Sequence, residues 1–255
     1  GGERAPAPAA CPDIEPGRYV LGKQFVSSGP IDAKIRTYAQ ASNDVAGVAN
    51  QAELEVAQAC TRVGLDLGVP ASAMQPRQEN GGRASGACGP AAAAVDGIMR
   101  QGAAVIVRVT PPFCSPNGVA QSQCGNACNV NPGDAECAAS CRAHGEIYAT
   151  CTPALIMVAP QTPNALSLRL SATLSANLPA LLHAELALGR RLGGAVGTVS
   201  QVGSALPGLV GQAGGAMALG CVTAGQAQVN AASWQLQATV RASALVTNRV
   251  GATSG

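Results

Sequence analysis

Aromatic side chains are scarce in this sequence: its 255 residues include one Trp, three Tyr and two Phe. Proteins that bind single-stranded nucleic acid need aromatic rings on which the bases stack, and deep ligand pockets are usually lined by aromatic side chains. The shortage disfavours both classes and requires a core of Ala, Val, Leu and Ile. Charged residues make up 12% of the chain, about half the usual share, and the net charge of +2 gives no basic field for nucleic acid.

Common catalytic motifs are also absent. The sequence has no phosphate-binding P-loop, no dinucleotide-binding glycine fingerprint, no C-x-x-C redox pair, no G-x-S-x-G and no H-E-x-x-H. Of the two histidines, His183 lies two residues before Glu185, a spacing at which helical side chains do not face each other. His144 lies near Glu136 and Glu146 and could belong to a metal or proton-transfer site, although exposed polarity explains it equally well. We therefore expect no enzyme activity, no cofactor and no metal.

Ten cysteines contrast with these absences. An even number at this density in a small protein favours disulfides and an oxidising compartment outside the cytoplasm. The alternative is a zinc or iron–sulfur site, but structural zinc sites usually contain C-x2-C pairs, whereas the close pairs here are C-x3-C. The ten residues are Cys11, Cys60, Cys88, Cys114, Cys124, Cys128, Cys137, Cys141, Cys151 and Cys221.

The six central cysteines are arranged symmetrically about a turn. Facing residues of an antiparallel hairpin have a constant sum of residue numbers, and three cysteine pairs share the sum 265. These pairs are Cys114 with Cys151, Cys124 with Cys141, and Cys128 with Cys137. The midpoint lies between Pro132 and Gly133, in the turn sequence Asn-Pro-Gly-Asp. We predict three nested disulfides across one hairpin, with short helices as inner arms, because C-x3-C places both cysteines on one helical face.

The same register continues outward from the cysteines. Residues 105–110 face residues 155–160, and both runs are short, apolar and partly β-branched. A two-stranded β-ribbon at the base of the hairpin is the favoured interpretation. Continuation of the flanking helices is the alternative, because short apolar runs are ambiguous.

The four outer cysteines are assigned by a weaker argument. A disulfide between Cys60 and Cys88 closes the loop between the first two expected helices. The pairing of Cys11 with Cys221 then follows by elimination.

Apolar residues at helical spacing predict long amphipathic helices. One extends from about residue 28 to residue 63, and its Ala-rich seam requires close approach of a neighbour. A second helix is expected from about residue 90 to residue 101, and a third begins near residue 162. The third carries an unbroken i, i+4 row of leucines, suited to helix packing, and contains Pro179, which is expected to kink it.

We expect three parts in the chain. Residues 1–27 are Pro- and Ala-rich and are interpreted as an N-terminal tether. Residues 28–104 and 161–250 form the helical bundle, and residues 105–160 form the hairpin. The expected fold class is mainly α: a bundle of about four long helices with a protruding, disulfide-stapled hairpin that has a short β-ribbon base and a helical tip. The chain shows no signal peptide, so any export signal is expected to have been removed.

Residues 192–240 contain no charged residue. Two small-xxx-small motifs, Gly193/Gly197 and Gly211/Gly215, could support helix packing in a membrane. The segment lacks a block of about 20 residues rich in Leu, Ile or Phe, so buried or interfacial helices packed through Gly and Ala are favoured. An uncharged small-residue surface also suits a self-assembling subunit, because no charge has to be desolvated. These four glycines are the candidate interface residues.

Short motifs distributed over much of the chain indicate a family. They are Gly1-Gly2-Glu3, residues 59–60, 64–69 and 110–114, the C-x3-C at 124–128, and residues 151–153 and 177–179. In these motifs the chain resembles uncharacterised, Ala-rich, cysteine-containing bacterial envelope lipoproteins. The resemblance implies an extracytoplasmic location and a lipid anchor on a cysteine preceding Gly1, and it implies no activity.

The cysteines, the missing catalytic motifs and the charge-free segment together predict a structural protein of the envelope or the extracellular space. Its expected partners are further copies of itself or other envelope proteins, and no nucleic acid. The alternative is a periplasmic or surface binding module for a lipid or protein partner. A third possibility is a protein whose residues 192–240 insert into a bilayer.

Overall fold

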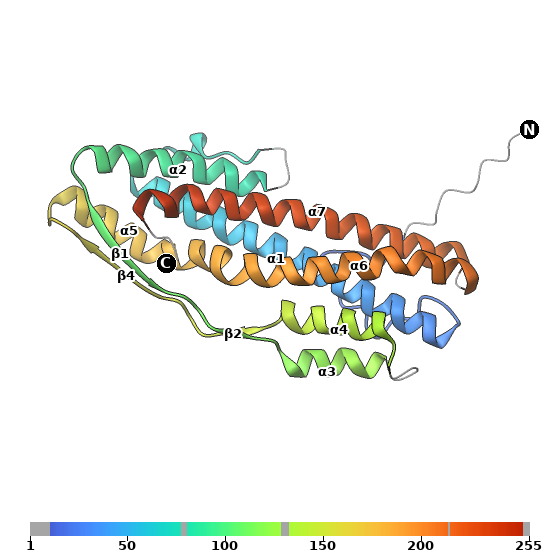
Figure 1. Ribbon diagram of the computed structural model, residues 1–255. Helices are drawn as coiled ribbons and strands as arrows, with labels where there is room; N and C mark the ends of the chain where they lie inside the picture. The colour runs from blue at the N-terminus through green and yellow to red at the C-terminus, as the bar shows by residue number, and fades with distance from the viewer. Residues whose placement is uncertain (1–10, 78–80, 129–132, 214, 252–255) are drawn as a thin grey trace, which may run out of the picture. The chain divides into compact units, whose positions relative to one another are not determined.

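The computed structural model describes residues 11–77, 81–128, 133–213 and 215–251, with backbone alone for residues 189–191 and 211–213. The described residues are mostly helical (Figure 1). The α-helices are α1 (Gly29–Asp66), α2 (Gly82–Arg100), α3 (Gly118–Ala127), α4 (Ala135–Ile147), α5 (Ala165–Leu182), α6 (Gly189–Ala213) and α7 (Gly215–Thr247). The remaining elements are the strands β1 (Val105–Thr110), β2 (Cys114–Ser115), β3 (Thr150–Cys151) and β4 (Leu155–Pro160), the π-helix η2 (His183–Leu188) and the 3-10 turns η1 (Ala71–Ala73) and η3 (Asn248–Val250). The expected fold class, mainly α with a small β-ribbon and a helical tip, is confirmed.

Contacts between residues divide the chain into two compact units. The first unit contains the described parts of Gly1–Val48, Pro116–Ala149 and Leu192–Ala232. The second contains the described parts of Ala49–Ser115, Thr150–Arg191 and Ser233–Gly255. Helices α1 and α7 contribute residues to both units, and the hairpin segment 105–160 is divided in the same way. Its β-ribbon belongs to the second unit and its helical tip to the first.

A core of Leu, Val and Ala side chains holds the second unit together. Helices α2 and α5 and the parts of α1 and α7 in this unit contribute to it. The row of leucines on α5 is buried at each turn from Leu170 to Leu182, as the i, i+4 spacing predicts. The side chains of α2 in this core are mainly Ala, so this helix can approach its neighbours closely. The disulfide between Cys60 and Cys88 joins α1 to α2 at a Cα–Cα distance of 4.8 Å.

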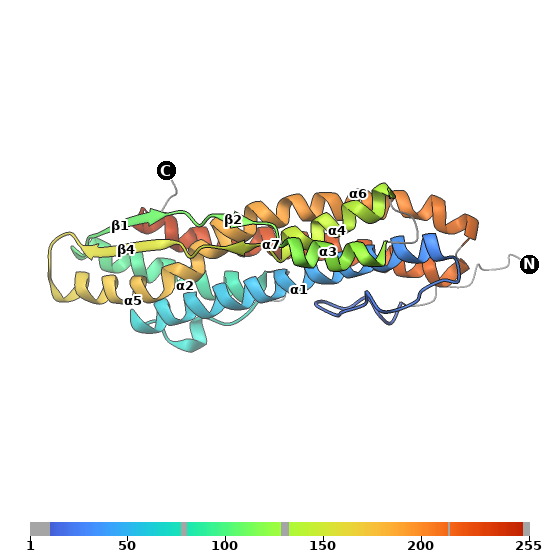
Figure 2. The ribbon, with the colours of Figure 1, turned by 90° about the horizontal axis from the view of Figure 1, so that it is seen from below.

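The expected β-ribbon is present in the expected register. Strand β1 pairs antiparallel with β4, from Val105 opposite Pro160 to Thr110 opposite Leu155, so facing residues sum to 265 throughout. Figure 2 shows the two strands side by side next to α5. Alternate residues of each strand turn towards the core of the second unit, and the others turn to solvent. The β-ribbon interpretation is therefore correct, and the alternative of continued helices is excluded.

All ten cysteines are paired. The disulfides are Cys11–Cys221, Cys60–Cys88, Cys114–Cys151, Cys124–Cys141 and Cys128–Cys137. These are the three nested pairs of the hairpin and the two outer pairs that the sequence favours. Five disulfides in one chain of this size indicate an oxidising environment outside the cytoplasm.

Tyr38 of α1 is fully buried in the first unit. Its hydroxyl donates a hydrogen bond to the carbonyl of Val222 at 3.3 Å. A Cβ atom at Gly225 would lie 2.7 Å from the Tyr38 ring, and one at Gly203 would lie 2.6 Å from its hydroxyl oxygen. The charge-free segment 192–240 of α6 and α7 therefore accommodates this ring only because both positions are glycine. Burial raises the pKa of Tyr38 to about 12, against a smaller opposite effect of its hydrogen bond with Ser42.

Helices α3 and α4 form the tip of the hairpin and lie side by side (Figure 1). Each begins at a side-chain cap: Asn117 accepts hydrogen bonds from two backbone N–H groups of α3, and Asp134 accepts one from Cys137 of α4. The disulfides Cys124–Cys141 and Cys128–Cys137 cross the pair. Leu21 is buried with Cys124 and Cys141 in a small cluster, and Ala143 and Ile147 of α4 are buried as well.

The segment before α1 has neither helix nor strand in its described part, residues 11–27, but it lies against α1. Val20 is fully buried, and its N–H donates to the side-chain oxygen of Gln40 at 2.6 Å. The amide of Asn43 donates to two backbone carbonyls of the segment. The described part of the expected tether is therefore held in place by buried contacts, and residues 1–10 lie outside the described residues.

Helix α2 begins at Gly82, eight residues before the expected start near residue 90. The missing N-terminal cap is supplied by another helix, because Glu53 of α1 accepts a hydrogen bond from the backbone N–H of Arg83 at 2.9 Å. The carboxylate of Glu53 is buried and also accepts from Nε2 of Gln235 at 2.5 Å. A cap of this kind leaves no signal in the local sequence.

Pro179 lies inside α5, one turn before the regular helix changes to the π-helix η2. A proline removes one backbone N–H from the helical hydrogen-bond pattern. The expected disturbance of this helix thus coincides with a π-helical segment that continues directly into α6.

Candidate functional site

A buried polar cluster lies between α1 and α4 in the first unit. At its centre is Asp44 of α1, whose side chain is fully buried. Its Oδ1 accepts hydrogen bonds from Nε2 of Gln40 at 2.8 Å and from the hydroxyl of Tyr148 at 3.0 Å. Its Oδ2 is hydrogen-bonded to Nδ1 of His144, whose ring contacts that of Tyr148 edge to face at 5.0 Å. Because a carboxylate has no proton to donate, Nδ1 of His144 carries the proton in this arrangement.

Helix α4 is also attached to α1 by ion pairs near its start. The Nζ of Lys34 lies 2.8 Å from Oδ2 of Asp134 and 3.2 Å from Oε2 of Glu136. Burial alone would lower the pKa of Lys34, but the hydrogen bonds and charges of the two carboxylates raise it. Burial alone would raise the pKa of Asp134, but hydrogen bonds to Lys34 and to the N–H of Cys137 lower it. Charged groups thus hold α4 on α1 near both of its ends.

The Asp44–His144 pair has the form of an orienting carboxylate and a base, and the nearest hydroxyl along α4 within the described residues is that of Ser140. Ser140 lies one turn before His144 on α4, and its hydroxyl has no hydrogen-bond partner within the described residues. It is fully buried, so a substrate cannot reach it. Burial and the charge of Asp44 raise the pKa of Tyr148, which keeps its hydroxyl protonated. The geometry supports a structural role in which this cluster fastens α4.

His144 is therefore not an exposed polar residue of the tip. Its partner is Asp44, one hundred residues earlier in the chain, rather than Glu136 or Glu146. No group of three or more His, Cys, Asp or Glu side chains within the described ranges could hold a metal ion.

His183 and Glu185 lie in the π-helix of the second unit. The Nδ1 of His183 lies 4.0 Å from Oε2 of Glu55, and both side chains are partly exposed. The Oε1 of Glu185 accepts hydrogen bonds from the hydroxyls of Ser243 and Thr247, each at 2.8 Å. Burial raises the pKa of Glu185, and these two hydrogen bonds oppose the shift.

The outward side of the β-ribbon exposes large apolar side chains. We call it the outer ribbon face; its residues are Ile106, Arg108, Thr110, Leu155, Met157 and Ala159. The exposed fractions are 47% for Ile106, 66% for Leu155 and 69% for Met157. Phe113, three residues beyond β1, is 74% exposed. Apolar groups at this density on one side of a short sheet are typical of an interaction surface.

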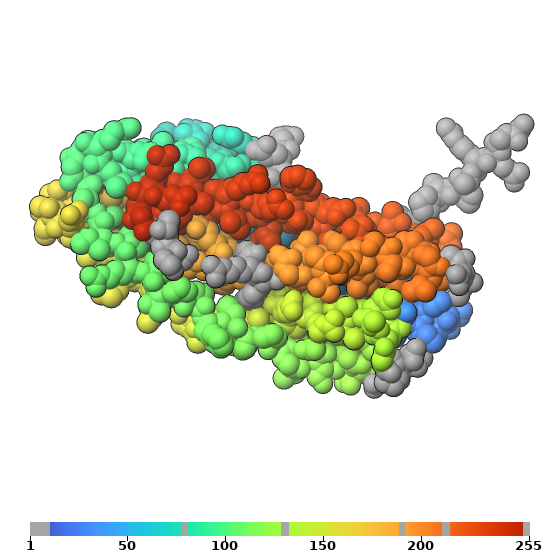
Figure 3. Space-filling model, viewed as in Figure 1, coloured from blue at the N-terminus to red at the C-terminus, as the bar shows by residue number. Residues whose placement is uncertain are grey.

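The small-residue stripe expected as an interface is exposed where it is described. No neighbouring atom lies within 4 Å of a Cβ placed at Gly193, Gly197 or Gly215. Gly211 belongs to α6, but its surroundings lie outside the described residues. Figure 3 shows α6 in orange at the surface, beside the first part of α7. No other described residue would contact a Cβ atom at these three positions, so they remain a predicted interface.

No helix in the described parts of the chain combines the length and the apolar character needed to cross a bilayer.

Comparison with known proteins adds no relative to this description. A scan against protein-family models, a search of curated proteins and a search of solved structures each found no match for the chain.

Proposed function

We propose that the protein is a structural protein of the cell envelope or the extracellular space that associates with further copies of itself through the outer ribbon face. The observation that carries the proposal is the exposure of Ile106, Leu155 and Met157 on one side of a two-stranded sheet. Five disulfides support the location, because such bonds persist in oxidising compartments. The proposal includes no catalytic activity, since Asp44, Ser140 and His144 of the polar cluster are buried.

A second copy is the occupant that the charge distribution favours. The net charge of the chain is +2, so long-range repulsion between copies is weak. The outer ribbon face carries one charged residue, Arg108, which lies directly across the strands from Met157. Its aliphatic stem can cover apolar surface while the guanidinium stays in water. The faces of two ribbons can therefore pack on each other, as sheets do in a β-sandwich, without burying an unpaired charge.

The size of the face sets the expected strength of association. Six residues at about 3.4 Å each make strands of about 20 Å, and two strands about 4.8 Å apart give a face of roughly 200 Å². Stable interfaces bury about 800 Å² per partner. The outer ribbon face alone therefore predicts weak, reversible and concentration-dependent association, which is strengthened if Phe113 or the glycines of α6 also take part.

Sedimentation velocity over a wide range of concentrations tests this proposal. Met157→Glu places a charge in the centre of the face, opposite Arg108, so the ribbon stays paired while a carboxylate must be desolvated on association. Leu168→Glu is the matched control, because Leu168 is 54% exposed on α5 and lies outside the face. The wild type and the control are expected to associate and Met157→Glu to remain monomeric. A wild type that stays monomeric at the highest concentration, or a Met157→Glu variant that associates like the wild type, would refute it.

The second candidate function is a binding module. A pocket between α1 and α2 favours it.

A further inference from the structure

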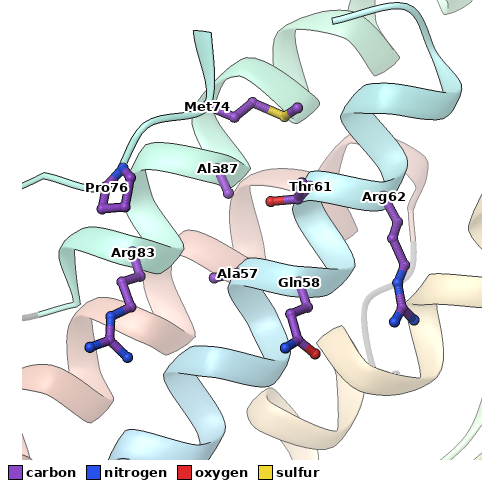
Figure 4. A pocket seen from close by; sticks show the side chains of 8 residues that line it. All are labelled: Ala57, Gln58, Thr61, Arg62, Met74, Pro76, Arg83 and Ala87. Carbon is purple, nitrogen blue, oxygen red and sulfur yellow. The ribbon is translucent and has the colours of Figure 1, made fainter. Parts of the chain in front are cut away.

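A surface pocket of about 290 Å³ lies in the second unit, between α1, α2 and the segment that connects them. Its polar lining comes from Gln58, Thr61 and Arg62 of α1 and from Arg83 of α2. Figure 4 shows Arg83 and Arg62 on opposite sides of Gln58 and Thr61, with their guanidinium groups extended in the same direction. Met74 and Pro76 of the connecting segment close the other end. The pocket thus has a cationic side and an apolar side.

Neither arginine is neutralised by a carboxylate among the described residues. Two neighbouring carboxylates are already engaged elsewhere: Glu53 accepts from the N–H of Arg83 and from Gln235, and Asp66 accepts from the hydroxyl of Thr173 at 2.6 Å. No described carboxylate oxygen lies within 4.0 Å of a side-chain nitrogen of either arginine. Within the part of the chain that the structure describes, two guanidinium groups on one pocket are therefore available to an oxyanion, which each can bind through paired N–H donors.

The walls of the pocket are held close by glycines. A Cβ atom at Gly64 would lie 2.4 Å from the sulfur of Met74, which packs over this position. At Gly82 and Gly86 a Cβ atom would lie 2.1 Å from backbone oxygens of Arg77 and Gln75. The connecting segment consequently lies directly on both helices, and no side chain larger than glycine fits beneath it at these points.

A disulfide fixes the distance between the two arginine-bearing helices. Cys60 precedes Thr61 on α1, and Cys88 follows Ala87 on α2, so the bridge joins the helices beside the pocket. The small side chains of Ala57 and Ala87 leave the space between the helices open. A pocket that is already formed needs little ordering when a ligand binds.

We propose that this pocket binds an organic anion, with its carboxylate or phosphate group attracted by the positive charges of Arg62 and Arg83 and a short apolar chain against Met74 and Pro76. The volume corresponds to roughly ten water molecules, which suits a ligand of about ten non-hydrogen atoms. The cationic side favours anions over neutral ligands of the same shape, because only an anion accepts charge-assisted hydrogen bonds from the arginines. This proposal is independent of self-association through the outer ribbon face.

Titration with octanoate, observed through ¹³C-labelled methionine methyl groups, tests the proposal. The chain has four methionines, of which Met74 lines the pocket, while Met157 and Met217 are exposed and report non-specific contact. We expect a saturable shift of the Met74 signal with a dissociation constant on the order of 1 mM or tighter, and no saturable shift of the two exposed methionines. Octyl phosphate distinguishes the two head groups: whichever of the two probes binds more tightly supports the proposal and identifies the preferred anion.

Variants and a neutral probe separate this site from a merely apolar crevice. Arg62→Gln and Arg83→Gln are each expected to weaken octanoate binding by about fivefold or more. Arg100→Gln is the control, because Arg100 is exposed on α2 outside the pocket, and it should leave binding unchanged. The proposal is overturned if 1-octanol binds as tightly as octanoate, if inorganic phosphate binds as tightly as octyl phosphate, or if the Met74 signal does not saturate.

Discussion

Replacement of Asp44 by alanine removes an acceptor on which three donors converge. The donors are Nε2 of Gln40, the hydroxyl of Tyr148 and Nδ1 of His144. A buried donor left without an acceptor costs about 1–3 kcal/mol. Tyr148 is 44% exposed, so its hydroxyl can turn to water, whereas Gln40 is 2% and His144 is 7% exposed. Two uncompensated donors therefore predict a loss of about 2–6 kcal/mol in the free energy of unfolding.

Two milder variants of the same cluster make the prediction sharper. In Asp44→Asn the amide oxygen can still accept from Gln40 and Tyr148. The amide N–H can donate to Nδ1 of His144 once the imidazole proton moves to Nε2. The expected loss is about 1–2 kcal/mol, because one amide hydrogen remains without a partner. Tyr148→Phe removes a single, partly exposed donor and should cost about 1 kcal/mol or less.

Urea unfolding of the oxidised protein, followed by far-UV circular dichroism, measures these losses. Amide hydrogen exchange in α4 is the local probe, because the single tryptophan, Trp234, lies in the second unit and does not report on α4. Asp96→Ala is the matched control, since Asp96 forms an ion pair with Arg249 at 2.8 Å that is open to solvent and is expected to contribute less than about 1 kcal/mol. If Asp44→Ala costs no more than this control, the cluster does not fasten α4 and the reasoning fails.

Three further predictions concern close packing and titration. Gly225→Ala should destabilise the protein by about 1–3 kcal/mol, because the new Cβ would press on the Tyr38 ring. Gly197→Ala has open space around the new Cβ and should stabilise α6 by about 0.5–1 kcal/mol. Thermal unfolding of both variants compares the two effects, and equal changes in stability would contradict the packing argument. Because the pKa of Glu185 is raised in the folded protein, its contribution to stability is complete below the pKa of Glu185 in the unfolded chain and is lost as the pH rises through the folded pKa. Glu185→Gln should therefore show a flatter dependence of the free energy of unfolding on pH between acid and neutral solution. An unchanged pH profile would exclude Glu185 as the origin of this dependence. The pKa of Tyr38, raised to about 12, predicts that stability is retained below pH 10 and lost as the pH rises towards 12, a loss that Tyr38→Phe should remove in alkaline unfolding titrations.

The hairpin could be derived from the sequence because its information is local and repeated. One sum of residue numbers relates three cysteine pairs and the two runs that become β1 and β4. A shift of the register by one residue would therefore break all three cysteine pairs and the pairing of the two strands at once. The structure keeps this register from Val105 opposite Pro160 to Cys114 opposite Cys151. The leucine row of α5 was predictable for the same reason, since a single period is repeated over several turns.

The role of His144 could not be derived in this way. Cys137, Cys141, His144 and Tyr148 recur at helical spacing, so the sequence does contain a signal that His144 shares a face with two disulfide-bonded cysteines. A side chain on that face is turned inward. The partner, Asp44, is one hundred residues away, and no local pattern identifies it. The start of α2 was missed for a related reason, because its cap comes from Glu53 on another helix.

The outer ribbon face is invisible to sequence patterns for a different physical reason. A strand with one buried face is recognised by alternation of apolar and polar residues. In β4 the exposed Leu155 and Met157 are as apolar as the inward-facing Ile156 and Val158, so both faces of this strand read as core. The same failure of alternation is what makes the face a candidate for self-association.

The small side chains that dominate this protein explain why its disulfides matter. Burial of an apolar side chain stabilises in proportion to its area, at about 25 cal/mol per Å², so cores of Ala and Gly gain little per residue. Loop-closure entropy assigns about 3 kcal/mol to the shortest bridge, Cys128–Cys137 with a separation of 9 residues, and about 5 kcal/mol to Cys11–Cys221 with a separation of 210. The loops are nested, so these contributions do not add fully. Even half of the sum over all five bridges, about 9 kcal/mol, is comparable with the net stability of about 5–15 kcal/mol of an ordinary domain. The oxidised cysteines are therefore a condition of the fold, and the same bonds that indicate an oxidising compartment make the folded protein dependent on it.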